Sequence, residues 1–190
     1  MCSLSEKGAS FPGRPDWADS LSRVLSPGHG FQADVLLFEG DAGIFVVKDF
    51  RGQGGWLRRW AGRWLCAREV RAYRRLEGVS AVPRLLERLD DFAFALEYRP
   101  GTWLSRALKG KVSKSFVKEL ERNVAAMHAK GVVHLDLRHR SNVLAGEDGR
   151  PVIIDFASAL CLRPGSWFCR GIARFDRRAV EKWRARIDPD

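Results

Sequence analysis

Five residues have side chains that can carry out chemistry together: Lys48, Glu69, Asp136, Asn142 and Asp155. The side-chain oxygens of Asp155 and Asn142 are hard ligands of the kind that Mg²⁺ prefers. The carboxylate of Asp136 can accept the proton of a hydroxyl group within hydrogen-bond reach. Lys48 supplies a fixed cation for a phosphate chain, and Glu69 can hold that cation in place. Together these five residues could bind a phosphate chain with Mg²⁺ and neutralise its negative charge.

Lys48 lies in the second strand of a predicted antiparallel hairpin, formed by the β-rich segments 31–38 and 44–50. Side chains alternate between the two faces of a strand. Lys48 therefore shares a face with three apolar residues, Ile44, Val46 and Phe50. This pattern places the lysine in an apolar row.

Glu69 lies on a predicted helix over 65–76. The apolar stripe of this helix has helical spacing and consists of Leu65, Ala72, Tyr73 and Leu76, with Glu69 among them. A carboxylate on an apolar face is costly unless a cation compensates its charge. Glu69 is therefore expected to have a cationic partner.

Further elements are predicted in the first half of the chain. They are a short helix over 16–25, a loop over 26–30, and strands over 83–89 and 92–98. Arg99-Pro100-Gly101 breaks the pattern, so we expect one lobe over about 17–98 and a second over 99–190. Residues 1–16, rich in Gly, Ser and Pro, read as a flexible lead-in.

The second half has a helical pattern over 113–129, closed by Gly131. Segments 143–145 and 152–156 form a predicted hairpin through Asp148-Gly149. A last amphipathic helix is expected to bury one face, which consists of Phe175, Ala179, Val180, Trp183 and Ile187. Asp136 and Asn142 then lie in a loop, and Asp155 lies at the end of a strand.

The order of these residues resembles that of the protein-kinase-like phosphotransferases. VVKDF with Lys48, HLDLRHRSNVL with Asp136 and Asn142, and IIDFASA with Asp155 are similar to the kinase lysine, catalytic loop and DFG segment. The resemblance spans residues 28–160. It implies an α+β, two-lobed fold, with a small antiparallel-sheet N-lobe and a truncated helical C-lobe.

The resemblance also implies ATP and Mg²⁺ as cofactors and a role for each residue. Lys48 is expected to hold the α- and β-phosphates with Glu69 behind it, and Asp136 to orient the acceptor hydroxyl. Asn142 and Asp155 are the expected Mg²⁺ ligands. The adenine is expected at a hinge that includes Glu97 and Tyr98. Arg138 or Arg140 is near enough in sequence to neutralise the transferred phosphoryl group.

Several features depart from the usual kinase pattern. Asn142 follows Asp136 by six residues instead of five, and the strand ends in Asp-Phe-Ala. In place of a glycine-rich loop the chain has only Gly28 and Gly30. Only 34 residues follow Phe156, which leaves little room for an activation segment. These departures resemble the compact RIO-type kinases and the bacterial kinases of lipopolysaccharide core sugars.

Each residue also has a purely structural interpretation. Lys48 can be a strand lysine whose stem packs on apolar neighbours, and Glu69 can pair at the surface with an arginine. Asp136 and Asn142 suit turns, and Asp155 suits a strand end. His134 is expected to support the loop backbone instead of contacting substrate.

Residues 51–64 combine tryptophan and arginine. The tryptophans Trp56, Trp60 and Trp64 recur at helical spacing, interleaved with Arg58, Arg59 and Arg63. One interpretation is a solvated loop whose tryptophans pack on the N-lobe. A second is an interfacial helix in which tryptophans and Leu57 enter an anionic membrane surface. A third is RNA binding through stacking and phosphate contacts.

Composition narrows the class of protein. The chain has 190 residues, 33 Lys plus Arg against 23 Asp plus Glu, and a formal charge of +10, which favours phosphate-rich partners. Its four cysteines lack C-x-x-C spacing, and no apolar run reaches 18 residues. We therefore expect a cytoplasmic protein, peripheral at most at the inner membrane face.

The sequence is compatible with two classes of acceptor molecule for the hydroxyl. The hydroxyl belongs either to a lipopolysaccharide core sugar or to Ser or Thr of a protein, as in RIO-like kinases. An alternative function is a nucleotide-gated RNA- or ribosome-binding module, or a pseudokinase. The presence of all five key side chains argues against the pseudokinase.

Overall fold

A computed structural model describes residues 21–40, 43–51, 55–113 and 115–187. The chain divides into two compact units. The first comprises Met1–Arg63 with Leu86–Tyr98, and the second comprises Trp64–Leu85 with Arg99–Asp190. Residues 64–85, which the sequence analysis placed with the first lobe, thus belong to the second unit. The expected lead-in over 1–16 lies outside the described residues.

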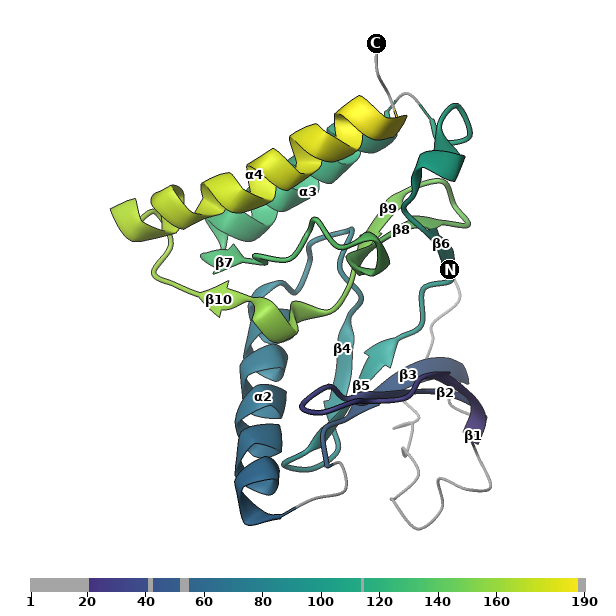
Figure 1. The fold of residues 1–190 in the computed structure, drawn as a ribbon, viewed down its shortest axis with the longest axis vertical. Helices are drawn as coiled ribbons and strands as arrows, with labels where there is room; N and C mark the ends of the chain where they lie inside the picture. The colour runs from purple at the N-terminus through teal and green to yellow at the C-terminus, as the bar shows by residue number, and fades with distance from the viewer. Residues whose placement is uncertain (1–20, 41–42, 52–54, 114, 188–190) are drawn as a thin grey trace, which may run out of the picture. The chain divides into compact units, whose positions relative to one another are not determined.

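The first unit contains a five-stranded sheet with the strand order β1-β2-β3-β5-β4 (Figure 1). The strands are β1 (Leu21–Ser26), β2 (Asp34–Gly40), β3 (Gly43–Asp49), β4 (Leu85–Arg88) and β5 (Ala93–Glu97). The predicted β2–β3 hairpin is present and antiparallel. Phe38, Phe45 and Val47 form a buried cluster with Ala93 and Ala95, so the sheet has an apolar core.

The predicted short helix over 16–25 is wrong where the structure describes it. Residues 21–26 form strand β1, which pairs with β2 in an antiparallel register that sets Leu21 opposite Phe38. Residues 16–20 lie outside the described residues. The edge of the sheet supplies hydrogen-bond partners that a short isolated helix lacks, and this outweighs a weak local propensity.

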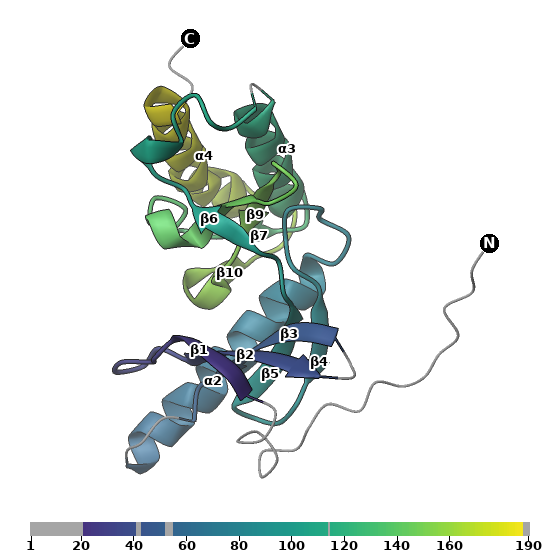
Figure 2. The same cartoon turned by 90° about the vertical axis from the view of Figure 1, so that its right-hand side faces the viewer.

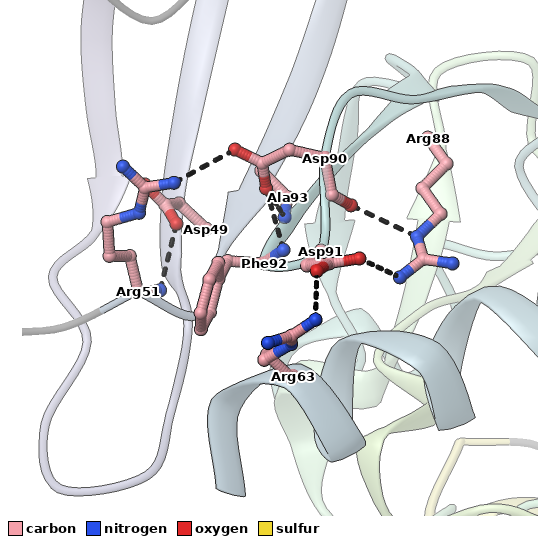
Figure 3. A network of polar contacts seen from close by, with 8 residues as sticks. All are labelled: Asp49, Arg51, Arg63, Arg88, Asp90, Asp91, Phe92 and Ala93. Atoms are coloured by element: carbon pink, nitrogen blue, oxygen red, sulfur yellow. Dashed lines mark hydrogen bonds and ion pairs between the residues drawn. The ribbon is translucent and has the colours of Figure 1, made fainter. Parts of the chain in front are cut away.

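Helix α2 (Trp56–Arg75) begins nine residues before the start predicted at Leu65. Its first half is tied to the β4–β5 turn by a polar network, drawn in Figure 3. Arg63 pairs with Asp91, which also pairs with Arg88 at 3.1 Å. Arg51 pairs with Asp90 at 3.2 Å. Of these pairs, Arg63–Asp91 joins the helix to the turn.

The second unit contains two long helices, α3 (Phe116–Ala129) and α4 (Trp167–Ile187), which pack side by side (Figures 1 and 2). Its strands form two small sheets, one of β6, β8 and β9 and one of β7 and β10. The bounds are β6 (Gly101–Trp103), β7 (Val132–Val133), β8 (Val143–Gly146), β9 (Pro151–Ile153) and β10 (Leu160–Cys161). Gly131 closes α3 with a φ of 75°, as its position predicted.

The buried face of α4 agrees with the predicted stripe except at one residue. Ala179, Val180, Trp183 and Ile187 are buried, whereas Phe175 is 50 % exposed. Asp176, one residue later, occupies the inner face instead. The predicted β8–β9 hairpin is present, with Val143 opposite Ile153. No helix among the described residues has the length and apolar character needed to cross a membrane.

Candidate active site

Asp136 and Asn142 are in direct contact in the second unit. The side-chain Nδ2 of Asn142 donates to Oδ2 of Asp136 at 2.9 Å and to the Asp136 carbonyl oxygen at 2.9 Å. One turn of 3-10 helix over Arg140–Asn142 takes up the additional residue of the loop. The six-residue spacing therefore still brings the carboxylate and the amide together.

His134 holds the backbone around this loop and is fully buried. Its Nε2–H donates to the carbonyl oxygen of Ile154 at 3.0 Å, and its Nδ1 accepts from the backbone N–H of Asp136 at 3.3 Å. One ring nitrogen donates and the other accepts, so the imidazole is neutral. Burial lowers the pKa of His134, which keeps it in this form.

Asp155 follows directly on the segment that His134 contacts. The backbone N–H of Ile154 donates to the carbonyl oxygen of Asn142 at 3.0 Å, which sets the end of this strand beside the loop. After Asp155, the N–H of Phe156 donates to Oε1 of Glu69 at 3.1 Å. These hydrogen bonds connect four of the predicted site residues within one unit, namely Asp136, Asn142, Asp155 and Glu69.

The Phe156 ring packs between two other rings. It lies edge-on to Tyr73 at 5.0 Å and tilted against His134 at 4.8 Å between ring centroids. Burial, together with the negative charges of Glu69 and Asp155, raises the pKa of the Tyr73 hydroxyl well above its ordinary value. Tyr73 is therefore a neutral packing residue, and the apolar contacts fix the backbone that carries Asp155.

The two non-glycine residues with positive φ in the described chain both lie in this site. They are Leu135, with φ 70°, and Asp155, with φ 64°. A left-handed conformation costs an L-residue roughly 1–2 kcal/mol, so the surrounding contacts must hold it. Such strain concentrates at functional sites. Its position here, at Asp155 and next to Asp136, agrees with a site for chemistry.

Asp176 of α4 supports the strained loop and was not identified from the sequence. Its carboxylate accepts from the backbone N–H groups of His134 at 2.8 Å and Leu135 at 2.9 Å. The Nε2–H of His128 donates to the same carboxylate at 3.0 Å. The sequence does contain a signal for Asp176. It lies three residues before Ala179 and four before Val180, so helical spacing places its carboxylate on the apolar face, as for Glu69.

Trp183, which the sequence analysis placed on the buried face of the last helix, also supports this loop. Its indole N–H donates to the carbonyl oxygen of Leu137 at 2.8 Å. The side chain is 2 % exposed. Helix α4 therefore holds the loop on both sides of Asp136. Asp176 binds the two residues before Asp136, and Trp183 binds the residue after it.

The residues predicted to bind the nucleotide lie in the first unit. Lys48 is buried between Val35 and Phe94 of the neighbouring strands, with Nζ 5.7 Å from the Phe50 ring centroid. Glu97 ends β5, and half-buried Tyr98 follows it. Glu69 belongs to the second unit, so its pairing with Lys48 stays a prediction.

Gly28 and Gly30 lie in the connection between β1 and β2. The N–H of Gly28 donates to Oδ1 of Asp34 at 2.8 Å, and a Cβ at this position would lie 2.5 Å from the Gln32 carbonyl oxygen. Gly30 has a φ of 63°. Both positions therefore favour glycine for backbone reasons, and their contact with phosphate stays a prediction.

Comparison with known proteins addresses the fold. No protein-family model and no curated protein matches the chain. Among solved structures, the Rio2 kinase from Chaetomium thermophilum matches with a TM-score of 0.67 and 14 % identity, over 91 % of this chain and 60 % of that one. A Rio2 kinase–ADP/Mg²⁺–phosphoaspartate complex from the same organism gives 0.61 and 16 %, over 90 % and 58 %.

The chain has a protein-kinase-like fold. The predicted α+β fold class is thereby confirmed, with an antiparallel sheet in one unit and few helices in the other. The chain spans about 60 % of the length of these kinases. At 14–16 % identity the likeness establishes the fold and leaves the activity to be argued from the site.

The kinase-like fold supplies few protein ligands for a metal. Among the residues that the structure describes, no group of three or more His, Cys, Asp and Glu side chains is arranged to hold an ion. Asn142 and Asp155 offer an amide and a carboxylate oxygen. Because Mg²⁺ is commonly held by one or two protein groups plus substrate phosphates, this set fits Mg²⁺ carried in with a nucleotide.

The tryptophans of α2 project from this kinase-like fold instead of packing onto it. Trp56, Trp60 and Trp64 are 80 %, 65 % and 52 % exposed, and Leu57 is 59 % exposed. The interpretation of residues 51–64 as a loop with tryptophans packed on the N-lobe is therefore wrong for the described part. The guanidinium groups of Arg59 and Arg63 lie over the Phe92 ring.

Proposed function

We propose that this protein is an ATP- and Mg²⁺-dependent phosphotransferase that moves the γ-phosphate to a hydroxyl group. The observation that carries the proposal is the contact between Asp136 and Asn142. Ile154, the residue before Asp155, donates its backbone N–H to the carbonyl oxygen of Asn142 and so brings Asp155 next to this pair. This arrangement supplies one carboxylate for an acceptor and two oxygen ligands for Mg²⁺. The strained backbone at Asp155 and Leu135 supports it.

In the proposed step, the acceptor oxygen attacks the γ-phosphorus while Asp136 accepts the hydroxyl proton. The bond from the γ-phosphorus to the bridging oxygen breaks, and ADP leaves with the electron pair. The Nδ2–H bonds of Asn142 keep the Asp136 carboxylate oriented, and the oxygen of Asn142 stays available to Mg²⁺. Bound Mg²⁺ neutralises charge on the phosphates.

We assign the nucleotide to residues of the first unit. Lys48 holds the α- and β-phosphates, supported by Glu69, and the loop with Gly28 and Gly30 covers them. The backbone at Glu97 and Tyr98 meets the adenine. Arg138 is exposed and lies two residues after Asp136. It neutralises the charge of the transferred phosphoryl group. These assignments rest on the kinase-like fold together with the burial of Lys48 in its strand.

A thermal-shift titration with Mg·ATP, paired with a γ-phosphate transfer or release assay, tests the proposal. Asp155→Asn removes the negative charge of the proposed metal ligand, while asparagine tolerates the left-handed backbone, so the Mg·ATP shift is expected to be strongly reduced. Asp136→Asn is expected to keep the shift and lower turnover by about 10²- to 10⁴-fold. Glu147→Gln, at an exposed turn, is the control. A wild-type protein without any Mg·ATP shift would overturn the proposal.

For the acceptor we propose a hydroxyl of a membrane-presented sugar lipid of the lipopolysaccharide core type, encountered at an anionic membrane surface. Exposed Trp56, Leu57 and Trp60 support this, because tryptophan favours the membrane interface. Residues 50–68 contain five arginines and no acidic residue, which suits anionic headgroups. A protein Ser or Thr is the second candidate, supported by the Rio2 structures.

Co-sedimentation with vesicles of phosphatidylglycerol and phosphatidylcholine tests the surface. Trp56→Ala/Trp60→Ala is expected to lower binding to anionic vesicles about tenfold or more. The control is Trp103→Ala, which removes a similarly exposed tryptophan from β6. Equal vesicle binding in the double variant and wild type would contradict the membrane surface. Salt-sensitive RNA binding lost in the double variant would instead favour the RNA-binding function.

A further inference from the structure

Beside Asp136, the second unit has a cavity of about 260 Å³. Its walls come from the loop after Asp136 and from α4, and they consist of Asp136, Arg138, His139, Ala179, Lys182, Trp183 and Arg186. A neighbouring hollow of about 380 Å³ shares four of these residues and adds Leu104, Ser105, Arg106 and Arg140. Both hollows lie within one unit, and the carboxylate of Asp136 lines the first of them.

The residues that line these two hollows carry a strong excess of positive charge. Five cations line the two hollows, Arg106, Arg138, Arg140, Lys182 and Arg186, against the single carboxylate of Asp136. Within the part of the chain that the structure describes, none of the five forms an ion pair with an acidic side chain. Other surface arginines do, such as Arg184 with Glu121. The cavity cations are therefore available to a ligand.

Part of the cavity wall is held in place. The buried Trp183 indole is fixed by its hydrogen bond to the Leu137 carbonyl oxygen. The guanidinium of Arg186 lies over the Trp183 ring, 5.1 Å from its centroid. Arg186 is thereby connected to the loop that carries Asp136. A guanidinium held in this way loses less conformational freedom when it binds a planar or tetrahedral anion.

We propose that this cavity is the acceptor site, and that the acceptor bears a carboxylate or phosphate next to its reactive hydroxyl. Lys182 and Arg186 bind the anionic group through charge-assisted hydrogen bonds. The hydroxyl then lies at Asp136, the group proposed to take its proton. The cavity suits the anionic group and the reactive hydroxyl beside it, and the rest of the acceptor can extend outside. The inference rests on the proposed phosphotransfer and specifies its substrate class.

Calorimetric titration of the full chain with four probes tests the site. The probes are inorganic phosphate, glucose 6-phosphate, gluconate and neutral glucose. We expect at least one of the anions to bind and glucose not to bind. In Lys182→Ala/Arg186→Ala the binding of that anion should be weaker by about tenfold or more. Arg170→Ala/Arg178→Ala removes the same charge from exposed positions of the same helix, outside the cavity, and should bind like wild type.

The result separates this inference from the proposed activity. Absence of binding by all three anions, equal binding of glucose, or equal loss in both double variants would overturn the anionic site. The Mg·ATP thermal shift is measured on the same proteins and should be unchanged in both double variants. Anion binding without any Mg·ATP shift would leave the site standing and overturn the phosphotransferase.

Discussion

The side-chain amide of Asn142 holds the carboxylate of Asp136, with Nδ2 2.9 Å from Oδ2. A second bond of the same length joins Nδ2 to the Asp136 carbonyl oxygen. The amide is thereby oriented with its hydrogens on Asp136 and its oxygen turned to other partners, among them the Ser141 hydroxyl at 3.1 Å. The pair thus separates the two proposed tasks: Asp136 serves the acceptor and the Asn142 oxygen serves the metal.

Asn142→Ala should destabilise the protein as well as impair phosphotransfer. Besides the bond accepted from the Ser141 hydroxyl, the change removes the two bonds donated to Asp136, at about 0.5–1.5 kcal/mol each, from a residue that is 3 % exposed. Urea unfolding should show a loss of about 1–3 kcal/mol in the free energy of unfolding. Ser141→Ala, which removes only the neighbouring hydroxyl, should cost less. Unchanged stability in Asn142→Ala would contradict the contact.

Asp176→Asn should weaken the support of the catalytic loop. The amide oxygen can replace only one carboxylate oxygen, so one of the N–H groups of His134 and Leu135 loses its acceptor. The cost is about 1–3 kcal/mol. A merely structural role predicts lower stability alone. A positioning role predicts that kcat also falls at a temperature where the variant is folded, while the KM for ATP stays unchanged.

Stability should fall as the pH is lowered through the ordinary pKa range of histidine. Burial lowers the pKa of His134, although Asp176, Asp155 and Asp136 partly oppose this shift. Between the folded and unfolded pKa values the unfolded chain binds more protons, so acid favours unfolding. The decline begins near the unfolded value of 6.5 and ends below the folded value. Melting temperatures from pH 8 to 5 should fall less steeply in His134→Gln; equal slopes would contradict the assignment.

Two adjacent aspartates of the β4–β5 turn should differ in their effect on stability. Oδ1 of Asp90 accepts from the backbone N–H groups of Phe92 at 2.6 Å and Ala93 at 2.9 Å (Figure 3). Asp90→Ala should therefore cost about 1–3 kcal/mol. Asp91 makes partly exposed ion pairs with Arg63 and Arg88, so Asp91→Ala should cost about 0–1 kcal/mol. Denaturant unfolding compares them, and the reverse order would contradict this account.

Local patterns in the sequence were sufficient for several elements of the fold. Alternation over residues 44–50 predicts β3, and the glycine after α3 has the left-handed backbone its position requires. Asp136 and Asn142 were predicted in a loop and Asp155 at the end of a strand, and the structure places Asp155 two residues after β9. These features depend on neighbours within a few residues, where backbone geometry alone sets the side-chain direction.

Tertiary contacts decided the rest. Residues 21–26 became β1 because the edge of β2 was available to pair with them, and α2 extended to Trp56 alongside the contacts of Arg63 with the β4–β5 turn. Asp176 reached the loop around Asp136 across 42 residues of sequence, and Trp183 reached it across 46. Periodicity carries no information about such distant partners, since each is chosen by packing of whole elements. The sequence by itself thus determined which groups can do the chemistry, whereas only the folded chain decided which residues hold them there.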